Sequence, residues 1–227
     1  MKIEILKTAD GSPTLYLPEL DETYHSRHGS VQEARHVFIQ HGLNFVIEEQ
    51  KKEKSADSTI QLLEVGFGTG LNALLTFQEA IQNPALHIAY RSYETQPIAE
   101  SIWSQLNYVN EKGAAHTYNN LMQASWNEKI PLNTNFDILK IDKAIQELDE
   151  ENHYDLIYFD AFGPRAQAEM WDVSVFKVLH RALKPNGILV TYCAMGQFKR
   201  DLKSLGFVVE SLPGPPGKRE MTRAVKV

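Results

Sequence analysis

The stretch from residue 60 to residue 206 alternates short apolar runs with amphipathic segments, and this alternation limits the fold more than any other feature. The runs at 60–65, 87–94, 136–142, 154–160 and 187–193 predict strands. Between them, helical spacing predicts helices at 71–82, 98–109, 144–149, within 171–183, and at 195–206. Strands that are apolar on both faces belong to a parallel sheet covered by helices on each side, so we expect an α/β, doubly wound, mostly parallel sheet.

The two ends of the chain depart from this pattern. Runs at 207–212 and 220–227 have no helix between them and predict a terminal antiparallel hairpin, which brings the sheet to seven strands. At the other end, residues 2–20 predict two strands around a turn at Asp10–Gly11, and 30–43 predicts a helix that Ser30 and Glu33 cap and Gly42 ends. The polar stretch 48–58 separates an N-terminal extension, 1–55, from the main domain, 56–227.

Composition excludes several classes of protein. The chain has 43% hydrophobic residues and a single cysteine, Cys193, so we expect a cytoplasmic globular protein without disulfides and without a metal site. Neither a signal peptide nor an apolar run long enough to span a membrane is present, so we expect no membrane partner. The net charge is −6, but residues 196–227 carry seven bases and three acids, which indicates either a local site for a polyanion or a solvated helix and edge strand.

A glycine-rich motif, LLEVGFGTGLN, lies where the first strand of the sheet meets its helix. Glycines permit a tight turn and let a ligand approach the backbone, although a purely structural turn has the same composition. Leucine at position 71 takes the place of the third glycine of a dinucleotide motif, which disfavours a dehydrogenase. The pattern resembles motif I of class I S-adenosyl-L-methionine (SAM) methyltransferases. That resemblance implies a Rossmann-like fold, SAM as cofactor, and cofactor contacts from Glu64, Gly66, Phe67, Gly68, Gly70 and Asn72.

Two further acids follow the next strands. Glu94 ends the second strand. A carboxylate at this place can accept hydrogen bonds from both ribose hydroxyls of an adenosine; the alternative is that Glu94 is a surface acid. Asp142 ends the third strand, where methyltransferases of this class often place an acid near the adenine amino group. We therefore expect both acids at the cofactor.

Asp160 ends the fourth strand and begins the sequence DAFGP. Its order of acid, small residue, aromatic and proline resembles the turn at which amine-directed methyltransferases hold their acceptor. An alkylamine is protonated at pH 7, with a pKa of about 10 by analogy with lysine, and only the neutral form is a nucleophile. A carboxylate attracts the ammonium, positions its nitrogen and can accept its proton. The sequence predicts Asp160 as the catalytic residue, also in contact with the cofactor, and leaves open whether it is a base or a positioning group.

Four segments together resemble the methyltransferase domain of MnmC-type tRNA-modifying proteins: HSRHGSVQEARHVF, GFGTGLN, DAFGPRAQAEMW and GKREM. The resemblance runs from about residue 20 to the C-terminus. It implies methylation of the 5-aminomethyl group of the tRNA wobble (2-thio)uridine, with Asp160, Phe162 and Pro164 at the amine. Three segments depart from the family pattern: Gln167–Ala168 after the acceptor turn, His25 in place of an aromatic, and GPPGKREM near the end.

The same resemblance implies a tRNA partner, bound through its anticodon stem-loop. Basic side chains are candidate phosphate contacts, and aromatic ones are candidates for stacking an everted base. The candidate substrate-binding residues are Tyr24, Phe162, Pro164, Arg165, Lys199, Arg200, Lys218 and Arg219. Trp171 is either a further stacking residue or part of the core, and Tyr24 either stacks a base or closes over the cofactor. A fused FAD-dependent oxidoreductase domain, present in larger family members, is not expected in this chain.

Two other functions fit parts of the sequence. An amine methyltransferase acting on a protein or a small molecule shares the motifs and needs no basic surface. A SAM-binding or RNA-binding protein without catalysis has no use for an acid at the acceptor position, so Asp160 disfavours it.

Overall fold

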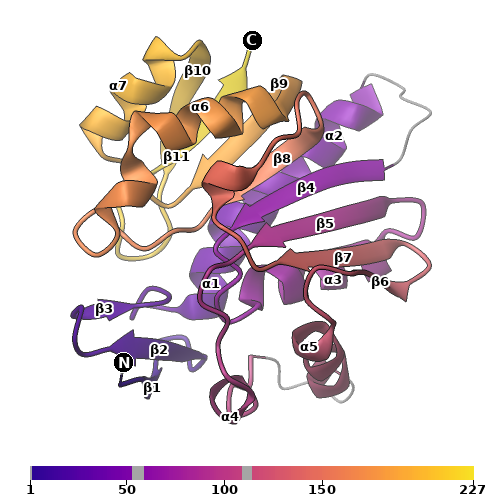
Figure 1. Ribbon diagram of the computed structural model, residues 1–227, viewed down its shortest axis with the longest axis vertical. Helices are drawn as coiled ribbons and strands as arrows, with labels where there is room; N and C mark the ends of the chain where they lie inside the picture. Colours follow the sequence, from indigo (N-terminus) through magenta and orange to yellow (C-terminus); the bar gives the residue numbers. More distant parts are fainter. Residues whose placement is uncertain (1, 53–58, 109–113) are drawn as a thin grey trace.

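A computed structural model describes residues 2–52, 59–108 and 114–227, and its centre is an eight-stranded sheet (Figure 1). The strand order is β10-β11-β9-β8-β4-β5-β7-β6. Five neighbouring strands run parallel: β4 (Thr59–Val65), β5 (His87–Tyr93), β7 (Phe136–Ile141), β8 (Tyr154–Phe159) and β9 (Leu183–Thr191). Three pair antiparallel at the edges: β6 (Lys129–Asn133), β10 (Phe207–Pro213) and β11 (Glu220–Lys226). The expected mostly parallel α/β fold is confirmed.

Both faces of the sheet are buried, as the apolar strands predict. Along β8, Leu156 and Tyr158 point into one core, and Ile157 and Phe159 point into a second core on the other face. The first core lies under α3 (Leu71–Gln82), α5 (Ala114–Gln123) and the helical segment that begins at residue 30, whereas α6 (Val173–Ala182) and α7 (Gly196–Ser204) cover the second. Because side chains alternate along a strand, a strand between two cores is apolar at every position.

Several sequence predictions need correction in detail. The sheet has an eighth strand, β6, and α5 was not predicted, because α5 is polar on its outer side and β6 is a half-exposed edge strand. The helix predicted over 98–109 is reduced to α4 (Glu100–Trp103), and residue 109 lies outside the described residues. The short helix expected at 144–149 is a single 3-10 turn, η2 (Ile145–Glu147). The boundary expected at residues 55 and 56 also falls outside the described residues.

The N-terminal segment forms a small sheet of its own, which lies near the carboxyl ends of the central strands (Figure 1). The predicted hairpin is present as β1 (Glu4–Lys7) and β2 (Pro13–Leu17), and a two-residue strand, β3 (Glu22–Thr23), extends it. Arg165 joins this sheet to the main domain, since its guanidinium donates to the Asp21 carbonyl (3.0 Å) and lies within 3.8 Å of the Glu22 carboxylate.

The helix predicted over 30–43 continues to residue 52, as α1 (Ser30–Ala34), a π-helix η1 (Arg35–Leu43) and α2 (Asn44–Lys52). Gly42 therefore does not end it. A Cβ at Gly42 would lie 3.0 Å from Val190 Cγ2 and 3.1 Å from Tyr158 Cε1, so glycine lets the helix approach the sheet closely. Ser30 is likewise not the cap: its hydroxyl donates to the Pro13 carbonyl, which fixes the helix against the N-terminal sheet.

The contact at Gly42 generates a prediction. Gly42→Ala should lower the free energy of unfolding by about 1–3 kcal/mol, because the added methyl group overpacks the first core. Gly196→Ala, at the first position of α7, is the matched control, since its Cβ would meet only the flexible guanidinium of Arg200. Urea unfolding of both variants measures the difference, and equal midpoints would contradict the packing argument.

Candidate active site

The carboxyl ends of β4 and β8 lie side by side, and this pairing brings the two predicted motifs together. Val65 pairs with Phe159, so the next residues, Gly66 and Asp160, are neighbours. Gly66 has a φ of 90°, and a Cβ there would lie 2.9 Å from the Asp160 carbonyl oxygen. A side chain at Gly66 would push the two strand ends apart, so the first glycine of the motif is needed for the approach of Asp160.

The glycine loop between β4 and α3 is held from the next strand by Glu94. One carboxylate oxygen of Glu94 accepts from the Gly68 amide (3.1 Å), and the other accepts from the Gln96 amide (2.8 Å). The ring of Tyr24 covers the loop from the N-terminal sheet, because a Cβ at Gly68 would lie 3.1 Å from Tyr24 Cδ1. The loop is thus fixed between an acid and an aromatic ring.

The far side of the same loop packs against a buried lysine. Lys140 is 1% exposed, and its ammonium donates to the carbonyls of Leu121 and Met122 at the C-terminal end of α5. The ammonium also lies over the rings of Phe67 and Trp126, at 5.2 Å and 4.9 Å from their centroids. Carbonyls at a helix C-terminus and aromatic faces attract a cation, which offsets part of the burial that lowers the pKa of Lys140 to about 8, so Lys140 fixes Phe67 and the loop from outside the cavity lining.

Asp160 is held at the end of β8 by two hydrogen bonds. Its amide donates to the Val65 carbonyl (3.1 Å), and its Oδ2 accepts from Asn72 Nδ2 (2.8 Å). Burial raises the pKa of Asp160 to about 7, although the Asn72 hydrogen bond and the nearby Lys218 ammonium act in the opposite direction. A carboxyl group that titrates near neutral pH can both accept and release a proton.

Glu64 lies behind this pair and, unlike Asp160, does not line the cavity. It is fully buried, its Oε2 accepts from the Ser92 hydroxyl (2.7 Å), and its Oε1 has no partner among the described residues. Burial raises the pKa of Glu64 to about 8, and the charge of Asp160 adds to this increase. The site therefore contains two coupled carboxyl groups, of which only Asp160 lines the cavity.

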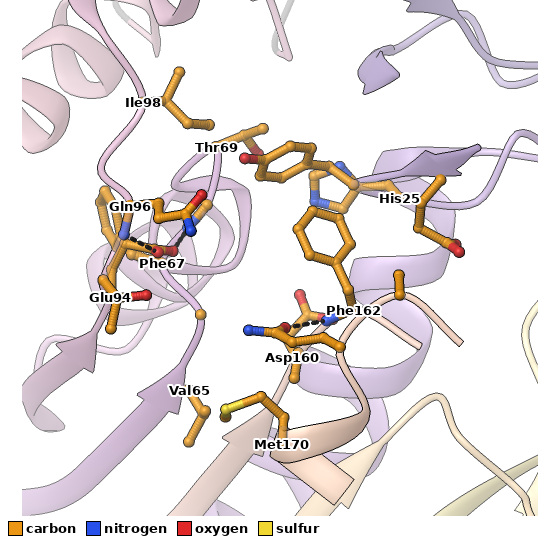
Figure 2. Close-up of a pocket in the computed structure, with 18 of the residues that line it drawn as sticks. His25, Val65, Phe67, Thr69, Glu94, Gln96, Ile98, Asp160, Phe162 and Met170 are labelled. Atoms are coloured by element: carbon orange, nitrogen blue, oxygen red, sulfur yellow. Dashed lines mark hydrogen bonds between the residues drawn. The ribbon is translucent and has the colours of Figure 1, made fainter. Parts of the chain in front are cut away.

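A cavity of about 840 Å³ joins these groups. Figure 2 shows Glu94, Phe67 and Gln96 on one side of it, His25 and Phe162 on the other, and Asp160 near the centre. The cofactor residues predicted from the sequence that line it are Gly66, Phe67, Gly68, Asn72, Glu94 and Asp160. The predicted substrate residues that line it are Tyr24, Phe162 and Lys218. The structure thus brings together residues from both predicted halves of the site.

The turn after Asp160 is fixed by side chains that bond its backbone. Tyr192 donates to the Ala161 carbonyl (2.8 Å), Trp171 Nε1 donates to the Phe162 carbonyl (2.7 Å), and the Phe162 amide donates to Gln167 Oε1 (3.2 Å). The ring of Phe162 meets Tyr24 edge to face, with centroids 4.9 Å apart. Trp171 is a core residue in this structure, packed against Phe159 and Phe198 in the second core.

Other predicted residues lie away from the cavity lining. Asp142 is exposed and its amide donates to Asn127 Oδ1, while the following segment, 143–146, lines the cavity instead. Gly70 lies beneath the loop, where a Cβ would meet Met122 Sδ at 2.6 Å. Pro164 is half-buried beside the cavity, and Arg165 is exposed, where it binds Asp21 and Glu22 outside the cavity lining.

The basic residues near the C-terminus are largely engaged within the protein. Three of the seven form ion pairs with acids of the chain: Lys199 with Glu220, Lys218 with Glu33, and Arg223 with Glu210. A fourth, Lys226, donates to Asn152 and to the Leu183 carbonyl. The exposed bases of this set are Arg200, Lys203 and Arg219. The basic region therefore presents less free charge than its composition indicates.

Several cavity residues were not predicted from the sequence. Glu33 was assigned to a helix cap, but its carboxylate lines the cavity, accepts from the Ser26 amide and binds Lys218 at 2.6 Å. His25, Tyr192 and Gln167 also line the cavity. Their signal in the sequence is weak, since each stands alone in its segment and is brought to the site only by folding.

Two searches of the described part of the chain gave negative results. None of its helices is long and apolar enough to cross a membrane. Within the same residues, no cluster of three or more histidine, cysteine, aspartate or glutamate side chains is arranged to hold a metal ion.

Comparisons with known proteins show what the chain is similar to. The model of a family described as S-adenosyl-L-methionine-dependent methyltransferase matches residues 109–227, which is more than half of the chain. Two relatives are named tRNA 5-methylaminomethyl-2-thiouridine biosynthesis bifunctional protein MnmC. The one from Cupriavidus metallidurans is 30% identical over 97% of this chain and 33% of its own length. The one from Cupriavidus necator is 32% identical over 97% of this chain and 34% of its own length. The chain thus spans about a third of these relatives.

A solved structure gives the same result for the fold. The crystal structure of MnmC2 from Aquifex aeolicus superposes with a TM-score of 0.81, at 23% identity, over 98% of this chain and 70% of that chain. The expected Rossmann-like methyltransferase architecture is confirmed by this match.

The buried carboxyl group of Glu64 generates a prediction about stability. Its pKa of about 8 exceeds the ordinary value of 4.5, so the folded state holds a proton that the unfolded state releases as pH rises between these values. Stability should therefore fall over this range, and Glu64→Gln should remove part of that fall. Relative to wild type, the free energy of unfolding of the variant should rise by on the order of a few kcal/mol between about pH 5 and about pH 8.

Urea unfolding at both pH values measures this gain. Glu128→Gln, which changes an exposed carboxylate, is the control and should follow wild type. Parallel stability curves for wild type and Glu64→Gln would show that the Glu64 carboxyl is charged in the folded protein.

Proposed function

This chain belongs to the S-adenosyl-L-methionine-dependent methyltransferase family, and from that premise we propose that it methylates the 5-aminomethyl group of the tRNA wobble (2-thio)uridine. The observation that carries the proposal is Asp160. Its Oδ1 has no hydrogen bond from a described residue and lies in the same cavity as the glycine loop, at the position where an amine would meet the methyl donor. The matched relatives, whose printed name specifies 5-methylaminomethyl-2-thiouridine, support the choice of amine.

The residues present fit the cofactor. Gly66 and Gly68, which have positive φ and line the cavity, present backbone without a side chain there, and Glu94 offers carboxylate oxygens next to them. The loop of Gly66, Phe67 and Gly68, with Asn72, would hold the methionine part, and Glu94 would hold the ribose hydroxyls. Residues 143–146, which follow Asp142, would border the adenine. When bound, SAM would supply a methyl group on a positively charged sulfur, and this sulfur is the leaving group when a neutral amine takes the methyl group.

The chain's own contribution centres on the proton of the amine. The substrate enters as an ammonium ion, which the carboxylates of Asp160 and Glu33 attract. Asp160 Oδ1 accepts a hydrogen bond from the ammonium and then its proton, which leaves the nitrogen lone pair free. The raised pKa of Asp160 makes this transfer easier than for an ordinary aspartate, because the difference in pKa between the two groups is smaller. Asn72 keeps Oδ2 occupied, so that Oδ1 faces the amine.

One observation favours the alternative of a smaller amine substrate. Four of the seven C-terminal bases are bound within the protein, so the surface offers few free charges to a polyanion. The two substrate classes are distinguished by incubating the purified protein and labelled SAM with tRNA and a cell extract, both from cells that lack this activity. Label in 5-methylaminomethyl-2-thiouridine supports the proposal, and label confined to protein or small molecules supports the alternative.

Asp160 itself provides the next prediction. Asp160→Asn should retain the hydrogen bond to Asn72 and SAM binding, but kcat should fall by about 100-fold or more, because the amide cannot accept the proton. For wild type, kcat/KM should decrease as pH falls below about 7, since Asp160 becomes protonated. Calorimetry with SAM and steady-state kinetics measure the two effects. Loss of SAM binding in the variant would make Asp160 a cofactor ligand instead of an acceptor group.

The exposed bases provide a prediction about RNA. Arg200 lies on α7, which follows the carboxyl end of β9, and Arg219 is next to the cavity residue Lys218. Replacing both by alanine should raise KM for RNA and reduce the slope of log KM against log salt by about 1 per charge removed. Lys51→Ala is the control, because Lys51 is exposed at the end of α2, away from the cavity. Equal slopes for all proteins would place the RNA on another surface.

A further inference from the structure

His25 lies in a segment whose backbone is fixed against two elements. The amide of Tyr24 donates to the Leu15 carbonyl (2.9 Å), and the amide of His25 donates to Thr14 Oγ1 (3.1 Å), both on β2. The amide of Ser26 donates to Glu33 Oε1 (2.9 Å) on α1. All three residues of the segment line the cavity. Their backbone has little freedom, so the position of the imidazole is set by the fold.

The imidazole is buried without a compensating hydrogen bond. His25 is 8% exposed, and its Nδ1 has no partner among the described residues. Burial lowers the pKa of His25 to about 4, so at neutral pH the ring is uncharged, with one donor and one acceptor nitrogen. An unsatisfied polar group is costly inside a protein, so this residue of the cavity lining lacks a partner that a bound ligand can supply.

The surroundings of His25 belong to the acceptor side of the cavity. Figure 2 shows His25 and Phe162 on the same side of the cavity, across from Glu94. Glu33 and Lys218 line the same cavity, joined by an ion pair of 2.6 Å, with the Lys218 ammonium 3.9 Å from the centre of the Tyr192 ring. This wall therefore combines an aromatic face, a neutral donor and acceptor, and a fixed cation.

We propose that His25 is a specificity-determining residue that hydrogen-bonds the polar edge of the nucleobase carrying the acceptor amine. A uracil ring presents an imide N–H flanked by a carbonyl oxygen at C4 and by an oxygen, or in 2-thiouracil a sulfur, at C2, and a neutral imidazole can pair with the N–H or with the C4 oxygen. Lys218 and Phe162 line the same cavity, where they offer a cation to a carbonyl oxygen and a ring for stacking. His25 does not act on the amine, which Asp160 holds. This inference rests on the proposed function, because it requires that the amine be attached to a base.

The test compares three substitutions of His25. His25→Phe keeps an aromatic ring but removes both nitrogens, whereas His25→Asn and His25→Gln place an amide near the positions of Nδ1 and Nε2. The substrates are an anticodon stem-loop RNA with 5-aminomethyl-2-thiouridine and the free nucleoside. His25→Phe should raise KM about tenfold for both substrates, with kcat and SAM affinity unchanged, because the loss corresponds to one hydrogen bond. At least one amide variant should recover most of the loss.

The thermal midpoint separates this role from a structural one. If the imidazole nitrogen has no hydrogen-bond partner until a ligand binds, His25→Phe should be as stable as wild type or more stable, since it removes an unsatisfied buried group. His116→Phe is the matched control, because His116 is an exposed residue of α5 outside the cavity lining, and its KM should equal that of wild type.

Each remaining outcome overturns the inference. An unchanged KM in His25→Phe, with wild type active on both substrates, removes His25 from base recognition and leaves the proposed function intact. A lower thermal midpoint in His25→Phe, with no recovery in either amide variant, makes His25 a structural residue. Wild type that turns over neither substrate overturns the proposed function, and the inference fails with it.

Discussion

The close approach of two strand ends, β4 and β8, is the constraint on which the rest of the site depends. Their register makes Gly66 and Asp160 neighbours, and a Cβ at Gly66 would lie 2.9 Å from the Asp160 carbonyl oxygen. Asn72, the second residue of the helix α3 that follows the glycine loop, then reaches back to hold the Asp160 carboxylate at 2.8 Å. One loop thus serves both halves of the cavity: it leaves space beside Glu94 for the proposed methyl donor and orients the acid that we propose receives the amine.

The N-terminal segment forms the part of the cavity wall that the central sheet does not provide. A Rossmann-like sheet leaves the carboxyl ends of its strands open, and here Tyr24, His25 and Glu33 close one side of the opening. Two ion-pair contacts hold the segment in place, Arg165 with Glu22 at the acceptor turn and Lys218 with Glu33 deeper in the cavity. The first is exposed and contributes little stability by itself, so the second, which is partly buried, fixes the segment more firmly.

The sequence predicted the fold and the centre of the site because both have local signals. Apolar strands with both faces buried, a glycine motif at a strand end, and an acid at the end of another strand are readable without knowing the contacts. Residues that reach the site from other segments are not readable in this way. Glu33 looks like a helix cap, and Gly42 looks like a helix end until the strands beneath it are known. The count of basic residues also overestimated the free positive charge near the C-terminus, because Lys199 and Lys218 bind acids that lie far from them in sequence.

The central claim is that the methyl donor and the acceptor amine meet at Asp160. A crystal structure with bound S-adenosylhomocysteine tests this most directly, because this product of methyl transfer from SAM retains the sulfur atom. The account predicts ribose hydroxyls within hydrogen-bond distance of the Glu94 carboxylate and a sulfur that faces Asp160 across the cavity. A ligand whose sulfur points away from Asp160, or that leaves Glu94 without a ribose contact, would contradict it.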